Sequence, residues 1–372
     1  MPASEARSDG VPAWRRDGKP PGRARIFALR RATFPRVLRV AAFNSPRNPM
    51  SLTIWCNAKF SAADTQRLVE GTRAHQLVFS ANASASVLVA GQADPALVAA
   101  DIAFGQPDPA QCLALPKLRW VEVTTAGYTR YDTPEFQETF RARGSIFSNV
   151  SQVFADPCAQ HVLAMMLALG RQLLPSHRDQ LTDQSWHYAQ RRYDSRLLTG
   201  QTVVMLGFGA IGRRLAELLA PFGMTLIAVR RQTRSERGVR IIPEEGISTA
   251  LEQADHVVNI LPDNASTLNY VNARRLACIK PGARFYNVGR GTTVDQRALL
   301  EALRSGRLAG AYLDVFEVEP LPAGDPLWTA PNCWITPHTA GGRSDQDEAI
   351  VKHFLANLAA FERGAAMVDR VV

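Results

Sequence analysis

The segment Gln201–Gln232 constrains the fold of this 372-residue chain more than any other. It reads QTVVMLGFGAIGRRLAELLAPFGMTLIAVRRQ: a strand-like run, a glycine-rich turn, a helix with an apolar stripe and a second strand-like run. This context is the one in which a GxGxxG turn binds a dinucleotide. Gly207 permits the tight turn, Gly209 lets the backbone approach a pyrophosphate, and Gly212 lets helix and strand pack closely. The residues expected to bind the cofactor here are Gly207, Gly209, Ala210, Ile211 and Gly212.

The end of the second strand carries the signal for cofactor preference. NAD enzymes usually place an acidic residue there to bind the ribose 2′-hydroxyl. This chain instead has Val229-Arg230-Arg231-Gln232. Arg230 and Arg231 are suited to clamp a 2′-phosphate, so NADP(H) is favoured. NAD(H) stays possible if the two arginines are only solvated surface residues.

Apolar runs alternate with helical stretches over most of the chain. The predicted strands are LTIW (52–55), SVLVA (86–90), IAFG (102–105), LRWVEV (118–123), SIFSN (145–149), VVMLG, TLIAV, HVVNIL, ARFYNVG, GAYLDV and CWITP. The segments AADTQRLVEG, DPALVAAD and Asp345–Phe361 have helical spacing. A long apolar helix is expected to begin at Asp156-Pro157, a cap followed by a proline at the first helical position. Such alternation predicts an α/β fold with parallel sheets covered on both faces.

The net charge of +9 is concentrated at the start of the chain. Residues 1–50 hold eleven basic and three acidic residues, which leaves 32 and 31 for the rest. A nearly neutral remainder argues against a nucleic-acid surface. The proline-rich basic segment is expected to be disordered. It is a translated upstream region with the true start at Met50, a disordered tail or a targeting peptide.

The five cysteines form no CxxC pair and match no zinc spacing, so no metal site is expected. With no secretory signal, reduced thiols and a cytoplasmic location are favoured. No apolar run is long enough for a membrane span.

Charged residues follow three of the later predicted strands. They are Arg290 in NVGRG, Glu319 in LDVFEVEP and His338 in TPH. Strand ends of an open parallel sheet converge on one crevice, where ligands bind. Arg290 suits a substrate carboxylate, and His338 suits proton exchange with the neighbouring carbonyl oxygen. Glu319 suits a hydrogen bond that orients the imidazole and favours its protonated form.

The chain resembles the D-isomer-specific 2-hydroxyacid dehydrogenase family, from about Leu52 to Val372. The resemblance lies in LTGQTVVMLGFGAIGRRLAELLAPFGM and NVGRGTTVDQRALLEALRSGRLAGAYLDVFEVEPLPAGDPLWTAPNCWITPHTAG, and more weakly in LPKLRWVEVTTAGYTRYD and DPCAQHVLAMMLALGRQL. It implies hydride transfer between NAD(P)H and a small 2-oxo or D-2-hydroxy acid. It also implies that Arg290, Glu319 and His338 are the catalytic residues.

The resemblance implies an architecture as well. Two Rossmann-like, doubly wound parallel-sheet domains would flank an active-site cleft. The substrate domain would span 51–156 plus 341–372, and the NAD(P)-binding domain 157–340. A homodimer is implied, joined through the cofactor domain. Further implied site residues are Ala126 and Gly127 for the substrate carboxylate, and Pro262, Val288, Gly289, Asp314 and His338 on the cofactor side.

The sequence departs from the family pattern at Arg230-Arg231 and at Gln160, where the family often has Glu before His161. The sequence does not identify the side chain of the substrate. Glyoxylate and hydroxypyruvate rank first, with a pocket expected near Cys56–Lys59, Gly105–Gln106, Ala126–Tyr128 and Trp328–Trp334. L-lactate and L-malate dehydrogenases are disfavoured, because their glycine loop lies near the N-terminus. A formate- or phosphite-type dehydrogenase and a dinucleotide-binding corepressor remain alternatives.

Overall fold

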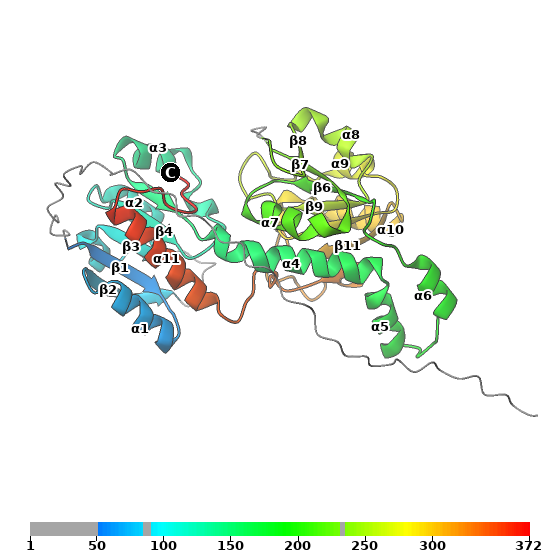
Figure 1. The fold of residues 1–372 in the computed structure, drawn as a ribbon, viewed down its shortest axis with the longest axis horizontal. Helices are drawn as coiled ribbons and strands as arrows, with labels where there is room; N and C mark the ends of the chain where they lie inside the picture. Colours follow the sequence, from blue (N-terminus) through cyan, green and yellow to red (C-terminus); the bar gives the residue numbers. More distant parts are fainter. Residues whose placement is uncertain (1–50, 85–90, 231–234) are drawn as a thin grey trace, which may run out of the picture. The chain divides into compact units, whose positions relative to one another are not determined.

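The computed structural model describes residues 51–84, 91–230 and 235–372 (Figure 1). The basic segment 1–50, the predicted strand SVLVA (86–90) and Arg231 lie outside the described residues. Within them, two parallel sheets with helices on both faces confirm the predicted α/β class.

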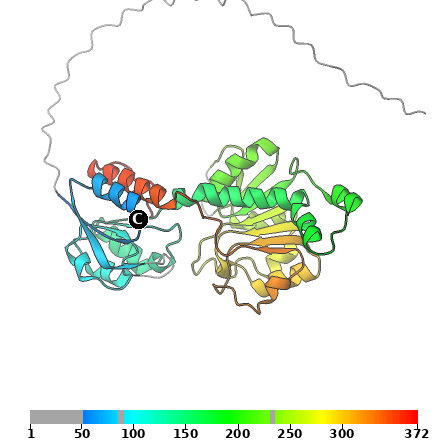
Figure 2. The ribbon, with the colours of Figure 1, turned by 90° about the horizontal axis from the view of Figure 1, so that it is seen from below.

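The first sheet has five strands in the order β2-β1-β3-β4-β5, all parallel. Apolar side chains fill both faces, as expected for buried parallel strands: Ile54 packs toward one set of helices and Trp55 toward the other. The helices α1 and α11 lie side by side on one face, and α2 and α3 cover the other (Figure 2). The bounds are β1 Thr53–Ala58, α1 Ala62–Gly71, β2 Gln76–Ser84, β3 Ile102–Gly105, α2 Pro109–Ala114, β4 Trp120–Val123, α3 Pro134–Ala142, β5 Ile146–Ser148 and α11 Gln346–Glu362.

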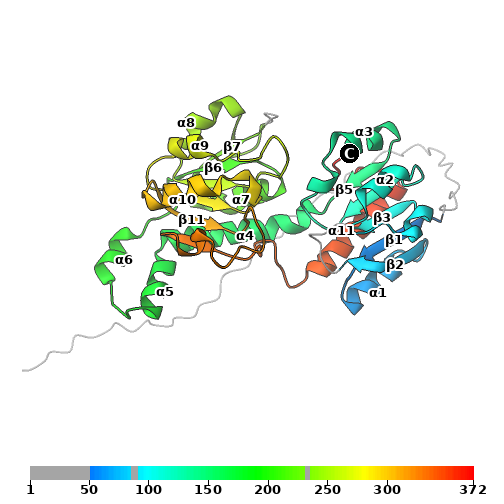
Figure 3. The same cartoon turned by 180° about the vertical axis from the view of Figure 1, so that it is seen from behind.

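The second sheet has seven parallel strands in the order β12-β11-β10-β9-β6-β7-β8. Along β6 successive residues alternate between faces: Val203 packs with α4 and α7, and Val204 packs with α8, α9 and α10. Figure 3 labels these helices beside the second sheet. The strand order reverses between β6 and β9, the position where dinucleotides bind in such sheets. The bounds are β6 Thr202–Leu206, α7 Ala210–Leu219, β7 Thr225–Val229, β8 Arg240–Ile242, α8 Ile247–Leu251, β9 His256–Asn259, α9 Ala273–Cys278, β10 Ala283–Asn287, α10 Gln296–Arg304, β11 Leu308–Leu313 and β12 Cys333–Ile335.

The prediction that the long helix begins at Asp156-Pro157 was wrong. Helix α4 spans Ser151–Gly170 and contains Pro157 in its interior. The side chain of Asn149 accepts a hydrogen bond from the Ser151 backbone N–H (3.2 Å) and helps to start the helix there. Pro157 cannot donate to the Val153 carbonyl one turn earlier. The guanidinium of Arg343 contacts that carbonyl instead, at 3.4 Å.

Among the described residues, α4 is the one helix long and apolar enough to meet the length and hydropathy criteria of a membrane span. Its Val162, Met166 and Leu169 pack into the core of the second sheet. The apolar composition is therefore explained in part by burial inside the protein. After α4 the chain forms α5 (Leu173–Leu181) and α6 (Tyr188–Asp194) before β6.

Candidate active site

The glycine-rich turn has the geometry that a bound pyrophosphate needs. Gly207 directly follows β6 and has φ +92°, and a Cβ there would lie 3.2 Å from the Ile260 carbonyl. A Cβ on Gly209 would meet nothing within 4 Å, so its space is open. Helix α7 follows with no side-chain cap, which leaves its first N–H groups for an anion. The turn therefore fits a dinucleotide.

One cavity of about 290 Å³ gathers most of the predicted site. The predicted residues among those that line it are Ala126, Gly127, Gly207, Gly209, Ala210, Ile211, Pro262, Val288, Gly289 and Arg290. Those not among its lining residues are Gly212, Arg230, Asp314, Glu319 and His338. The backbone turn, Arg290 and the glycine loop thus face a common space.

Three buried side chains hold the loop that carries Arg290. The amide of Asn259 donates to Asn287 Oδ1 (2.9 Å) and to Thr293 Oγ1 (2.7 Å). Asn287 and Thr293 in turn donate to the carbonyl of Arg290, at 3.2 and 2.6 Å. All three side chains are almost fully buried. Because Asn259 and Asn287 are register partners on β9 and β10, the sheet itself fixes the start of the loop.

Arg290 lies directly against Gly127. A Cβ on Gly127 would come within 1.7 Å of Arg290 Nη2. Burial lowers the pKa of Arg290, and the negative charges of Glu319 and Asp263 oppose that effect. The group remains a cation, because arginine is not deprotonated in proteins. A glycine at 127 is thus required for this position of the guanidinium.

Glu319 and His338 form a direct pair. His338 Nδ1 lies 2.7 Å from Glu319 Oε2, and Glu319 Oε1 accepts from the Phe316 N–H at 2.8 Å. Burial alone raises the pKa of Glu319, but the bonds from His338 and Phe316 outweigh it and hold the pKa below its usual value. The ionised carboxylate fixes Nδ1 as the donor, which leaves Nε2 for other chemistry.

Asp314 organises the segment that carries His338. Its carboxylate accepts from Thr336 Oγ1 (2.5 Å), the Thr339 N–H (2.8 Å) and the Ala340 N–H (3.0 Å). Its carbonyl accepts from the His338 N–H at 2.9 Å. With these bonds the buried carboxylate has a structural role. The cofactor-side role implied by the resemblance stays a prediction.

The cofactor-preference position contains a feature that the local sequence did not show. Arg230 follows β7, and its Nη1 lies 3.6 Å from Glu236 Oε1. A carboxylate therefore lies beside the arginine expected to bind a 2′-phosphate. Arg231 lies outside the described residues.

The predicted substrate-pocket segments behave differently from one another. Tyr128 lines the cavity, whereas Trp328 is half exposed and donates to the Pro322 carbonyl. Trp334 packs beside the core of the second sheet. Asn57 and Gln106 bond to each other, with Asn57 Oδ1 accepting from the Gln106 N–H at 2.7 Å.

One group of potential metal ligands occurs among the described residues, away from the cavity. It consists of Asp179, Asp183 and His187. Both oxygens of Asp179 already accept hydrogen bonds from Arg191 at 2.7 Å.

Comparison with known proteins agrees with this geometry. Residues 163–340 match the NAD-binding domain of D-isomer-specific 2-hydroxyacid dehydrogenases. A glyoxylate reductase of Pyrococcus furiosus is 31% identical over 259 residues, 67% of this chain and 74% of the relative. A glyoxylate reductase of Korarchaeum cryptofilum is 32% identical over 259 residues, 68% of this chain and 75% of the relative.

A solved D-isomer-specific 2-hydroxyacid dehydrogenase of Xanthobacter autotrophicus Py2, in complex with NADPH and MES, has the same fold. It superposes with a TM-score of 0.71 at 27% identity and covers 87% of this chain and 98% of that chain. The fold and the glycine turn define a nicotinamide-dinucleotide-dependent oxidoreductase. The chain belongs to the D-isomer-specific 2-hydroxyacid dehydrogenase family. It is an enzyme that acts on CH–OH donors and transfers a hydride between NAD(P)H and a 2-oxo or 2-hydroxy acid.

Proposed function

We propose that this enzyme reduces small 2-oxo acids, with glyoxylate and hydroxypyruvate as the first candidates. The observation that carries the proposal is the shared cavity, which Arg290, the Ala126-Gly127 turn and the glycine-rich turn line together. A buried cation beside a backbone turn suits a compact carboxylate. The glyoxylate reductases of P. furiosus and K. cryptofilum support this substrate class.

Each side chain has a role in the proposed reaction. Arg290 binds and orients the substrate carboxylate, and the backbone N–H groups of Ala126 and Gly127 complete its binding. The nicotinamide, when bound, supplies the hydride. His338 gives a proton to the carbonyl oxygen from Nε2. Glu319 holds the imidazole through Nδ1 and stabilises its charged form.

NADP(H) is the proposed preferred cofactor. Arg230 directly follows β7 and would exchange its ion-pair partner Glu236 for the 2′-phosphate. The Arg230→Ala variant is expected to lose NADPH preference, whereas Glu236→Gln is expected to strengthen it. Unchanged NADPH-to-NADH ratios in both variants would remove Arg230 from this role.

A homodimer is the proposed assembly, and the cytoplasm the proposed compartment. The segment from α5 to α6 exposes large apolar side chains, including Trp186 at 91% and Tyr193 at 74%. Such exposure is typical of a protein–protein interface. The five cysteines are free thiols, which fits a reducing compartment. No nucleic-acid or membrane partner is proposed.

The test follows nicotinamide absorbance with purified protein and NADPH or NADH. The acids are glyoxylate, hydroxypyruvate, pyruvate and a bulkier aryl 2-oxo acid. Turnover of the small acids with NADPH preferred supports the whole proposal. Equal or better use of NADH would remove the cofactor preference and leave the reaction intact. Dinucleotide binding without turnover of any acid would overturn the substrate assignment.

A further inference from the structure

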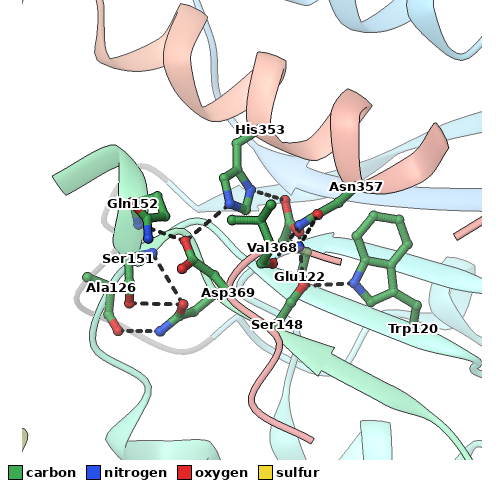
Figure 4. Close-up of polar contacts among 11 residues, drawn as sticks. Trp120, Glu122, Ala126, Ser148, Ser151, Gln152, His353, Asn357, Val368 and Asp369 are labelled. Atoms are coloured by element: carbon green, nitrogen blue, oxygen red, sulfur yellow. Dashed lines mark hydrogen bonds and ion pairs between the residues drawn. The ribbon is translucent and has the colours of Figure 1, made fainter. Parts of the chain in front are cut away.

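A buried charged cluster links the C-terminal helix to the first sheet (Figure 4). His353 on α11 lies between two carboxylates. Its Nδ1 is 3.1 Å from Glu122 Oε1 on β4, and its Nε2 is 3.2 Å from Asp369 Oδ2 in the C-terminal segment. Ionised carboxylates only accept hydrogen bonds, so both ring nitrogens must donate. The geometry therefore suits an imidazolium, whose two N–H groups would donate to the two carboxylates.

The side chains of the cluster are almost completely shielded from solvent. The side chain of Glu122 is fully buried, and those of His353 and Asp369 are each 8% exposed. Glu122 Oε2 also accepts from Ser148 Oγ (2.9 Å) and Asn357 Nδ2 (2.7 Å). A buried ion pair is seldom more stabilising than an apolar replacement of the same volume. The cluster is therefore better explained as fixing the positions of the segments it joins than as adding stability.

The other side of the cluster reaches the proposed substrate turn. Asp369 Oδ2 accepts from the Gln152 N–H in the first turn of α4, at 2.7 Å, and the Asp369 carbonyl accepts from the Asn149 N–H at 3.1 Å. Asn149 Nδ2 in turn donates to the Ala126 carbonyl at 2.7 Å. Ala126 and Ser151 both line the cavity. A short series of hydrogen bonds thus joins His353 to the place where the substrate carboxylate would bind.

We propose that His353 is a positioning residue for substrate binding: its two hydrogen bonds hold the Asp369 segment against Asn149 and the start of α4, and so fix the Ala126-Gly127 turn. The inference rests on the proposed function of that turn. With a neutral or absent His353, Glu122 and Asp369 would lose the cation that now donates a hydrogen bond to each of them. The bonds that Asp369 accepts from the Asn149 and Gln152 N–H groups would then loosen, while Val371 and Val372 still bond to Phe147, and the turn would lose part of its support.

The charges around His353 support its protonated state. Among the described residues, the charged groups that act on it are Asp369 and Glu122. Burial alone lowers the pKa of His353, but the hydrogen bonds and charges of Asp369 and Glu122 outweigh it and raise the pKa to about 9. The cation is therefore present at neutral pH and lost in alkaline solution.

The experiment compares wild type with His353→Gln and Asp369→Asn at neutral pH, using glyoxylate and the preferred nicotinamide. Both variants are expected to raise KM for the acid about tenfold, since a lost hydrogen bond to a charged group has about this effect. KM for the nicotinamide should stay within about twofold, because the glycine turn is not part of the series of bonds. The ratio of acid KM between His353→Gln and wild type should approach one above about pH 9, where the wild-type imidazole is neutral too.

His75→Gln is the matched control. His75 is also buried and also pairs with a carboxylate of the C-terminal helix, with Nε2 3.2 Å from Glu362 Oε1. Its other ring nitrogen accepts from the Leu52 N–H, and neither partner of His75 bonds to the Ala126-Gly127 turn among the described residues, so neither KM should change. Equal acid KM in wild type and His353→Gln, or an equal rise of both KM values, overturns the proposal. So does an acid KM ratio that does not fall with pH.

Hydrogen exchange on wild type provides a readout that needs neither a variant nor turnover. After correction for intrinsic rates, the amides of Asn149 and Gln152 should lose protection as the pH passes about 9. Unchanged protection overturns the positioning role. If wild type reduces no 2-oxo acid, the proposed function fails separately, and hydrogen exchange still tests the coupling.

Discussion

Replacing Gly127 with alanine places a methyl group where the Arg290 guanidinium now lies. The new Cβ would be 1.7 Å from Nη2, and ordinary contact begins at 3.4 Å. The guanidinium must therefore move by about 1.7 Å. A misplacement of about 1 Å in a catalytic arrangement can cost about 100-fold in rate. We expect kcat/KM for the 2-oxo acid to fall by about this factor.

The assay is steady-state nicotinamide oxidation, with dinucleotide affinity measured by fluorescence and folding by thermal denaturation. The affinity and the midpoint should barely change, because Gly127 has no positive φ and the displaced group is a side chain. Gly324→Ala is the control, since a Cβ there meets nothing within 4 Å. A folded Gly127→Ala enzyme with the wild-type kcat/KM would refute the contact between Gly127 and Arg290 as a determinant of substrate binding.

Three further predictions concern Arg290, the residues that hold its loop, and His353. Arg290→Lys keeps the charge but loses the planar fork, so kcat/KM for the acid should fall about tenfold or more while dinucleotide affinity holds; an unchanged kcat/KM would exclude bidentate binding. Asn259→Ala removes the two buried hydrogen bonds that Asn287 Oδ1 and Thr293 Oγ1 accept from the Asn259 amide, and should lower the free energy of unfolding by about 1–3 kcal/mol in a denaturant titration. His353 has a pKa raised to about 9 from 6.5, so its contribution is complete below about pH 6.5 and is lost as the pH rises through about 9. That contribution is about 3 kcal/mol, and unfolding titrations at neutral and alkaline pH should show its loss in wild type but not in His353→Gln.

The strands that carry the site were predictable because burial makes their sequences nearly continuous apolar runs. VVMLG, HVVNIL and GAYLDV all became central strands of the second sheet. Strands β2 and β8 were missed, and both lie at a sheet edge, where one side lacks a neighbour. QLVFSANAS mixes polar and small residues, and Arg240–Ile242 is only three residues long. Edge position and short length alone do not explain the two omissions, because the three-residue edge strands β5 and β12 were predicted from SIFSN and CWITP.

The helix start at Asp156-Pro157 was mispredicted because local capping rules compete with tertiary contacts. An aspartate before a proline is a sound helix start when nothing else repairs the lost hydrogen bond. Here Arg343, 190 residues further along the chain, contacts the Val153 carbonyl that Pro157 leaves without its helical donor. No pattern within a window around Pro157 contains that information.

The candidate active site divides in the same way between chemistry and positioning. Glycines in a strand–turn–helix context and an Arg, Glu and His after later strands can be recognised in the sequence, since few other residue types serve those roles. The side chains that hold these residues in place cannot be recognised in the same way. Asn259 and Thr293 resemble ordinary polar residues near strand ends until the register of β9 against β10 brings Asn259 beside Asn287. His353 is one more helical residue until its two carboxylates, 231 residues before it and 16 after it, close around the ring. Each of these groups depends on pairings between distant strands and segments. The precision of the site is therefore a property of the assembled sheets, and mutations at such positions should change how well the enzyme binds its substrate more than which reaction it catalyses.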